Sequence, residues 1–255
     1  MEISSELVLG LAILGLVAFA AVIQRITGLG FAMVTAPFLV VMLGPQDGVL
    51  LTNFLSIVAP ILMLPSVWRQ IEWRRALWIC AAGMAVVPPF GWVAAHSPPG
   101  PLYIVVASLV LVGLSLSVVL SRARTISDSR TARVLAGVGA GAGTVTAGVG
   151  GPAMTVYSVL TRWNVIGFAA TLQPVWIAMA ASAMLTKWGF SEDGVPALPW
   201  WVWTGCAVMI VLGLWAGALL QKRIPHELVR RTVIGLAFLG ALLALFTGIS
   251  TTLEG

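Results

Sequence analysis

The sequence contains few charged residues for its length. Only 9% of its 255 residues are charged and 59% are hydrophobic, whereas soluble domains average about 25% charged residues. A soluble fold of this length could not bury so much apolar surface, so the lipid bilayer is the natural solvent. The net charge of +5 is not interpreted as a nucleic-acid patch, because most basic residues fall in short loops between apolar runs.

The side chains that enzymes and metal sites use are also scarce. The two cysteines, Cys80 and Cys206, fall in apolar segments without a CxxC or zinc-type spacing. The two histidines, His96 and His226, fall at loops, and no Asp or Glu lies clearly inside an apolar segment. A haem site, a carboxyl proton relay and an intramembrane protease centre are therefore disfavoured. We expect no enzyme activity, no cofactor and no metal.

Ten apolar segments indicate an all-α membrane protein, a polytopic helical bundle. A full-length span needs about 20 residues, and the second and seventh segments are clearly shorter. Each short segment follows a glycine-rich turn, which predicts broken helices of the kind that form transporter sites. The segments run over residues 7–26, 30–43, 48–67, 75–95, 101–120, 133–147, 151–162, 165–187, 197–220 and 229–248.

The two halves of the chain resemble one another. A shift of 120 positions aligns the first half with the second, and a shift of 126 aligns the later segments. Several matches in order indicate an internal duplication. The matched pairs are Gly28 with Gly148, Gly30 with Gly150, Thr35 with Thr155, Asn53 with Gln173, Cys80 with Cys206, Gly91 with Gly217 and Pro99 with Pro225. We expect a first repeat over 1–120, a cytoplasmic linker over 121–132 and a second repeat over 133–255.

The basic residues predict the orientation of the repeats. Five segments per repeat is an odd number, so the second repeat must be inverted. With both termini outside, twelve of the 14 Lys and Arg residues fall inside, a strong positive-inside bias. These are Arg69, Arg74, Arg75, Arg122, Arg124, Arg130, Arg133, Arg162, Lys222, Arg223, Arg230 and Arg231. Lys187 falls outside, and Arg25 lies at the first turn. Four spans per repeat with re-entrant short segments remains an alternative.

The two glycine turns are the candidate substrate site. Two helices that begin after such turns would direct free N–H groups and the positive ends of their dipoles at one another, which forms an anion site with few charges. The alternative is that the glycines only allow close helix packing. The candidate substrate-binding residues are Arg25, Thr27, Gly28, Gly30, Asn53, Thr146, Gly148, Gly150, Gly151, Gln173 and Trp176.

Three of these residues have two interpretations each. The Arg25 guanidinium could bind a sulfonate or carboxylate through two parallel hydrogen bonds, or it could cap the cytoplasmic end of the first helix. Asn53 and Gln173 could contact substrate as a symmetric pair, or each could form an interhelical hydrogen bond. Ser56 and Trp176 lie three residues further on and share those helical faces.

At these turns the chain resembles the TauE/SafE sulfite-exporter family, also called the toluene-sulfonate-uptake family. The resemblance rests on the stretch from Thr27 to Phe31 with Pro37, and on the stretch from Gly148 to Pro152. It implies a bacterial inner-membrane carrier of sulfite, organosulfonates or related anions. The first turn reads GLGF and lacks the second glycine of the GVGGP turn, a difference between the two turns.

We therefore expect an exporter of a small anion, such as sulfite or a sulfoacetate-like sulfonate. The alternatives are a membrane scaffold that transports nothing, or proton-coupled uptake of a carboxylate or sulfonate. The expected partners are the anion, membrane lipids and a second copy in a homodimer. We expect no nucleic-acid partner.

Overall fold

The computed structural model describes residues 2–120, 125–190, 196–221, 223–224 and 226–254, and its described residues form helices without strands. The helices are α1 (Glu2–Thr27), α2 (Phe31–Leu43), α3 (Pro45–Val67), the 3₁₀ turn η1 (Trp68–Gln70), α4 (Trp73–Ala95), α5 (Pro99–Leu120), α6 (Arg130–Ala147), α7 (Gly151–Thr161), α8 (Val165–Phe190), α9 (Trp200–Leu220) and α10 (His226–Glu254). Each of the ten predicted apolar segments coincides with one α-helix. The prediction of an all-α membrane protein is confirmed.

Seven helices among the described residues are long and apolar enough to cross a membrane. They are α1, α3, α4, α5, α8, α9 and α10. The helices α2 and α7 have 13 and 11 residues, which at 1.5 Å per residue is too short for a span. The prediction that the second and seventh segments are short is therefore confirmed.

Glycine and proline set the limits of the two short helices. Helix α2 lies between Gly30 (φ 130°) and Gly44 (φ 89°), two backbone conformations that other residues rarely adopt. Helix α7 begins with Gly151 and Pro152, and the missing N–H of proline costs nothing in a first turn. It ends where Arg162 takes a left-handed conformation with φ 48°.

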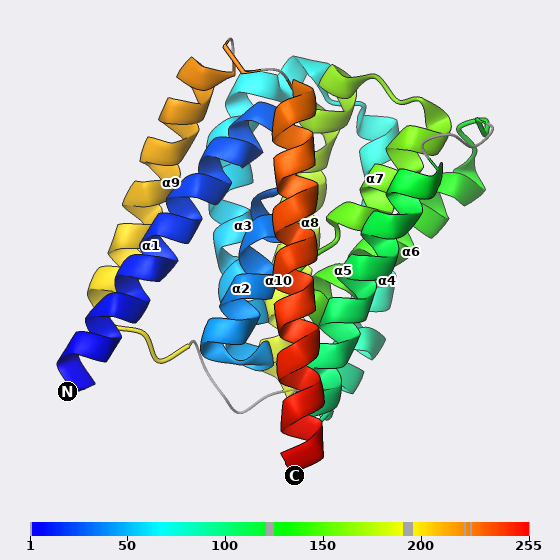
Figure 1. Cartoon of the computed structure of the whole chain (residues 1–255). Coiled ribbons are helices and arrows are strands. Elements are labelled where there is room, and N and C mark those ends of the chain that lie inside the picture. The colour runs from blue at the N-terminus through cyan, green and yellow to red at the C-terminus, as the bar shows by residue number, and fades with distance from the viewer. Residues whose placement is uncertain (1, 121–124, 191–195, 222, 225, 255) are drawn as a thin grey trace.

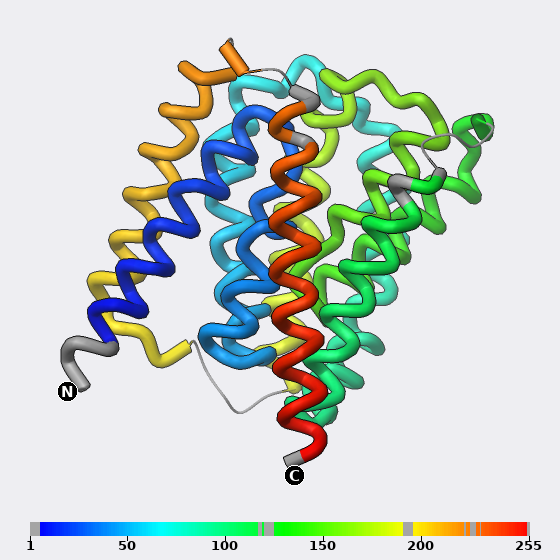
Figure 2. Tube along the Cα trace, viewed as in Figure 1, coloured from blue at the N-terminus to red at the C-terminus, as the bar shows by residue number. Residues whose placement is uncertain are grey.

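The helices pack in pairs that join the two halves of the chain. Helix α1 packs along α9, and α4 packs along α6. Helix α5 packs on α10, and α3 packs on α8. The pairing of distant segments is visible in Figure 2, where the dark blue trace of α1 runs beside the yellow and orange trace of α9. When each helix is replaced by the helix five places later, counting on from α10 to α1, the α1–α9 and α4–α6 pairings exchange. The α3–α8 and α5–α10 pairings stay the same.

The connections divide between two ends of the molecule. Figure 1 shows both termini at one end. The α3–α4, α7–α8 and α9–α10 connections and the start of α6 lie at the opposite end, which we call the basic end because Arg69, Arg162 and Arg223 lie in these connections. Lys187 lies within the last turn of α8, where it is buried and its Nζ donates to the Gln46 carbonyl at 2.8 Å.

The start of helix α6 falls within the expected cytoplasmic linker. Helix α6 starts at Arg130, inside the expected linker 121–132. The cause is an N-cap, because the Ser129 hydroxyl accepts a hydrogen bond from the Ala132 N–H at 3.1 Å. A serine in this position satisfies one of the free N–H groups of the first turn.

Candidate functional site

The first glycine of each turn has the same backbone conformation. Gly28 has φ 73° and Gly148 has φ 68°, so both occupy the left-handed region. The N–H of each glycine donates to the carbonyl four residues earlier, which is Gln24 in the first turn (2.8 Å) and Thr144 in the second (3.0 Å). A Cβ at Gly28 would lie 2.3 Å from the Cβ of Ala169. Glycine is therefore required by the backbone conformation and also by the close approach of α8.

Amide side chains from each half of the chain reach the turn of the other half. The Gln173 Nε2 on α8 donates to the Gly28 carbonyl at 3.2 Å and to the Ala169 carbonyl at 2.6 Å. The Asn53 Nδ2 on α3 donates to the Thr144 carbonyl at 3.1 Å. Both side chains are almost fully buried. The two residues that the 120-residue shift pairs thus each contact the turn of the other half, but the accepting carbonyls, those of Gly28 and Thr144, are not paired by that shift.

Gln24 extends this polar network and caps α2. Its Oε1 accepts a hydrogen bond from the Phe31 N–H at 3.3 Å, and its Nε2 donates to the Gly28 carbonyl and to Gln173 Oε1, both at 3.4 Å. The second turn has Thr144 at the matching position, whose hydroxyl donates to the Ala140 carbonyl at 2.7 Å. The two turns are therefore alike at Gly28 and Gly148, but they differ in side chains and at the next glycine, where φ is 130° for Gly30 and -88° for Gly150.

A small cavity lies between the two turns, and we call it the central cavity. Its volume is ≈ 30 Å³, enough for roughly one or two water molecules. Two polar atoms of its lining, Asn53 Oδ1 and Ser56 Oγ, are buried and have no hydrogen-bond partner within the described part of the chain. The lining residues are Gln24, Leu29, Gly30, Phe31, Ala32, Met33, Asn53, Ser56, Pro60, Thr144, Gly148, Gly150, Gly151, Trp176 and Ala180.

The central cavity can offer hydrogen bonds but no formal charge from its described lining. The first residues of α2 and α7 both line it, and the N–H groups of a first helical turn carry partial positive charge. Buried polar atoms without partners cost free energy unless a ligand or water binds them. The lining therefore suits a small polar guest that accepts hydrogen bonds from Ser56 and the first-turn N–H groups, and that donates one to Asn53 Oδ1 directly or through a water molecule.

Six of the eleven predicted site residues line the central cavity. They are Gly30, Asn53, Gly148, Gly150, Gly151 and Trp176. Gly28 and Gln173 lie behind the lining and bond to one another. Thr27 and Thr146 also lie outside it, and their hydroxyls donate to carbonyls within their own helix, those of Ile23 and Ala142.

Arg25 does not reach the central cavity. Its Nη1 donates to the Ser66 hydroxyl at 3.3 Å, near the end of α3. A Cβ at Gly217 would lie 2.7 Å from the Arg25 Cβ, so the side chain passes close to α9. Arg25 therefore contacts α3 and α9, away from the cavity that the two turns enclose.

Three polar residues of the lining, Gln24, Ser56 and Thr144, are not among the predicted site residues. The sequence places Ser56 on the same helical face as Asn53. The shift of 120 residues pairs Gln24 with Thr144. That pairing was the signal that could have identified them.

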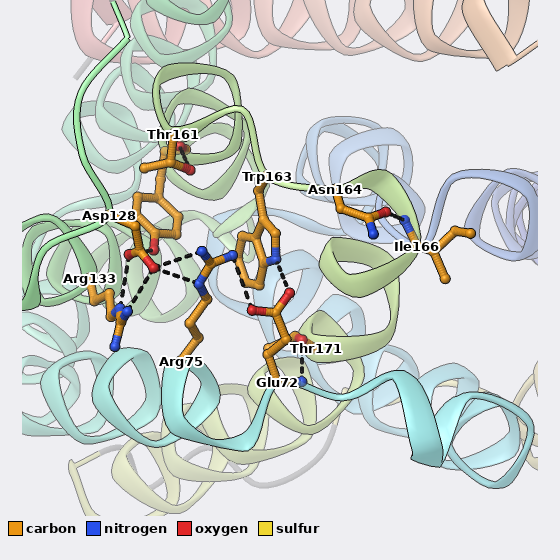
Figure 3. A network of polar contacts seen from close by, with 10 residues as sticks. Glu72, Arg75, Asp128, Arg133, Thr161, Trp163, Asn164, Ile166 and Thr171 are labelled. Carbon is orange, nitrogen blue, oxygen red and sulfur yellow. Dashed lines mark hydrogen bonds and ion pairs between the residues drawn. The ribbon is translucent and has the colours of Figure 1, made fainter.

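A second polar network lies at the basic end and is centred on the Asp128 carboxylate (Figure 3). Asp128 accepts hydrogen bonds from Arg75 Nε (2.7 Å), Arg133 Nε (2.9 Å) and the Tyr157 hydroxyl (2.6 Å). Arg133 Nη2 and Arg75 Nη2 also lie 2.6 and 2.7 Å from its Oδ2. The Arg133 hydrogen bond is the largest cause that holds the pKa of Asp128 well below its usual range, and Tyr157 and Arg75 add to it.

The Asp128 network continues to the loop between α7 and α8. Arg75 Nη1 lies 3.2 Å from the Glu72 carboxylate, and Glu72 in turn accepts a hydrogen bond from Trp163 Nε1 at 2.6 Å. The Arg75 guanidinium also lies over the Trp163 ring, 4.6 Å from its centroid. The start of α4, the start of α6 and the end of α7 are thereby joined.

The comparison with family models agrees with the membrane fold. Among the described residues, no group of three His, Cys, Asp or Glu side chains could hold a metal ion. No curated protein and no solved structure matches the chain. The model of the family described as sulfite exporter TauE/SafE matches residues 12–244, nearly the whole chain, and the protein therefore belongs to this family of membrane transporters.

Proposed function

We propose that the protein is a secondary transporter that exports a small sulfur-containing anion, sulfite or an organosulfonate, across a bacterial inner membrane. Membership of the TauE/SafE family and seven long apolar helices support transport across a membrane. The observation that carries the proposal is the central cavity, which both glycine turns line. Its Asn53 Oδ1 and Ser56 Oγ have no hydrogen-bond partner among the described residues.

The electrostatics of the central cavity support an anion as the substrate. The oxygens of a sulfite or sulfonate group accept hydrogen bonds, which the Ser56 hydroxyl and the first-turn N–H groups of α2 and α7 can supply. A site of partial charges attracts an anion without holding it too tightly for release. The ≈ 30 Å³ volume means that the lining must move apart before such an anion enters.

The helix pairing supports two repeats of opposite orientation, related by a twofold axis. The pairings α1 with α9 and α4 with α6 exchange under such a relation, whereas α3 with α8 and α5 with α10 map onto themselves. Transporters of this construction move one repeat against the other around a fixed site. The amides of Asn53 and Gln173, which cross between the halves, lie where this movement would act.

We propose that the membrane potential alone can drive export. The apolar segments lack a clear Asp or Glu that could carry a proton, and a negative interior drives an anion outward. One elementary charge gains about 2.3 kcal/mol per 100 mV. The proposal also places both termini outside, so the basic end faces the cytoplasm.

Flux in proteoliposomes tests the proposed function. Purified protein is reconstituted with sulfite, sulfoacetate, taurine, thiosulfate or a simple carboxylate inside, and a potassium–valinomycin potential is imposed without a pH gradient. We expect saturable efflux of at least one sulfur-containing anion that rises with the potential. Efflux equal to that of protein-free liposomes would indicate a scaffold, and efflux that follows only an imposed pH gradient would indicate a proton-coupled carrier.

A further inference from the structure

We propose that a second cavity, the vestibule, leads the anion from the basic end to the central cavity, and that Leu29 and Met33 form the closed partition between the two. This inference rests on the proposed function and adds the route and the gate. The vestibule has a volume of ≈ 480 Å³ and lies between α7, the start of α8, the first glycine turn and α10.

The vestibule and the central cavity share part of their lining. Leu29 and Met33 line the vestibule and the central cavity alike, so these two side chains border both spaces. A Cβ at Gly151 would lie 2.7 Å from Met33 Sδ and 3.0 Å from Leu29 Cδ1. Both side chains therefore rest against the start of α7, and their contact with Gly151 closes the passage.

The partition of Leu29 and Met33 can open without unfolding a helix. Leu29 lies in the turn between α1 and α2, and Met33 lies in the first turn of α2. Methionine has three rotatable bonds and fits irregular spaces. A change of side-chain rotamers, or a small shift of α2 relative to α7, would connect the vestibule with the central cavity.

The vestibule carries a positive charge. Arg162 is the one charged residue of its described lining, and it is exposed at the connection between α7 and α8. Thr155, Ser158 and Thr27 add hydroxyl groups along the wall, which can hold water. A positive charge at the mouth of a cleft raises the local concentration of an anion and its rate of entry.

A neighbouring groove provides the contrast. It has a volume of ≈ 640 Å³, lies between α5, α6 and α7, and has no charged residue in its described lining. Helix α7 separates the two spaces, so that Val159 lines the vestibule and Val156 lines the groove. Both valines are half-buried. They form a matched pair of positions on one helix, one in the proposed route and one outside it.

Thiol modification in proteoliposomes tests the vestibule. Val159→Cys and Val156→Cys are made in a Cys80→Ala, Cys206→Ala background and treated from the basic end with the anionic reagent MTSES, which is removed before flux is measured. Thiols react as thiolates, which form in contact with water. We expect MTSES to react at residue 159 about tenfold faster than at residue 156, in line with the effect of charged clefts on entry rates, and to block flux only in Val159→Cys.

Substitutions of Arg162 test the entrance of the vestibule, and substitutions of Leu29 and Met33 test the partition. Arg162→Gln should slow the anionic MTSES more than the cationic reagent MTSET at residue 159, because only the anion is attracted. Leu29→Ala and Met33→Ala should change the rate of flux without loss of folding, which gel filtration checks.

If the unmodified background transports but MTSES at residue 159 leaves flux intact, the vestibule is overturned and the proposed function stands. If the unmodified protein carries no anion, the proposed function fails as well.

Discussion

Asn53 and Gln173 occupy equivalent positions in the two halves but contribute differently to the site. Asn53 donates one hydrogen bond to the Thr144 carbonyl and has its Oδ1 free at the central cavity. Gln173 uses its amide to hold the Gly28 and Ala169 carbonyls and does not line the cavity. Asn53 Oδ1 is therefore positioned to accept a hydrogen bond from a protonated substrate oxygen, such as that of bisulfite, or from a bridging water, and Gln173 is positioned to hold the first glycine turn.

We predict that Asn53→Ala weakens anion binding more than Gln173→Ala does. Losing a buried polar partner costs about 1–3 kcal/mol, which corresponds to roughly 5- to 150-fold in the dissociation constant. Gln173→Ala should mainly lower thermal stability, because the Gly28 carbonyl loses a donor. Titration calorimetry and thermal unfolding measure the two effects.

Gln46→Ala is the matched control for these two amides. Gln46 also donates an amide hydrogen bond to a backbone carbonyl, that of Ala94 at 3.0 Å, but it lies outside the lining of the central cavity. Its substitution should leave the dissociation constant unchanged. Unchanged affinity in Asn53→Ala would instead make Asn53 an interhelical contact.

At the scale of helices and loops, the Asp128 network joins the residues before α6 to α4 and α7. Asp128 receives hydrogen bonds from two arginines and a tyrosine, and its side chain is only 18% exposed. Removing its charge would leave Arg75 and Arg133 facing each other without the carboxylate between them. Hydrogen bonds to charged groups contribute about 1.5–3 kcal/mol each.

We predict that Asp128→Asn destabilises the protein by about 1.5–3 kcal/mol, with Glu6→Gln, an exposed carboxylate, as the neutral control. The folded-state pKa of Asp128 is lowered, so its stabilisation is fully present above the unfolded pKa of about 4 and is lost as the pH falls through the folded pKa. Thermal unfolding should therefore show the same penalty from pH 5 to pH 8. A penalty that disappears as the pH rises within this range would contradict the assignment.

The limits of sequence reasoning are also clearest for helices and loops. Glycine and proline allowed both broken helices to be predicted from the sequence. The left-handed backbone at Gly28 and Gly148 and the proline in the first turn of α7 depend only on the local sequence. The direction of a side chain is not local. Gln24 and Arg25 are neighbours, about 100° apart around a helix, and the sequence could not show that Gln24 faces the cavity while Arg25 contacts α3.

Side-chain contacts between residues far apart in the chain could not be predicted from the sequence either. The linker was interpreted as a polar cytoplasmic joint, and nothing in its composition indicated that Asp128 bonds to Arg75, 53 residues earlier. The equivalence of Asn53 and Gln173, in contrast, followed from the 120-residue shift alone. A repeat provides three-dimensional information, because equivalent residues occupy equivalent environments.

For the whole molecule, both termini lie at one end and the basic connections lie at the other (Figure 1). We predict that cysteines at Glu6 and Leu253, in the Cys80→Ala, Cys206→Ala background, react with an impermeant maleimide in intact cells, because the positive-inside rule places the basic end in the cytoplasm. A cysteine at Arg69, in the α3–α4 connection, should react only after permeabilisation. The reverse pattern would show that the orientation is inverted.

Anion efflux from proteoliposomes that contain Gly150 variants tests the central claim most directly. A Cβ at Gly150 would lie 2.6 Å from Thr144 Oγ1 and 2.8 Å from the Trp176 ring, so Gly150→Ala should reduce efflux and Gly150→Leu should abolish it. Gly15→Leu is the control, because no atom lies within 4 Å of a Cβ there. Saturable efflux of a sulfur-containing anion in the native protein and in Gly15→Leu, with loss in folded Gly150 variants, is the predicted result. Equal efflux in all four proteins would contradict the assignment of the substrate site to the central cavity.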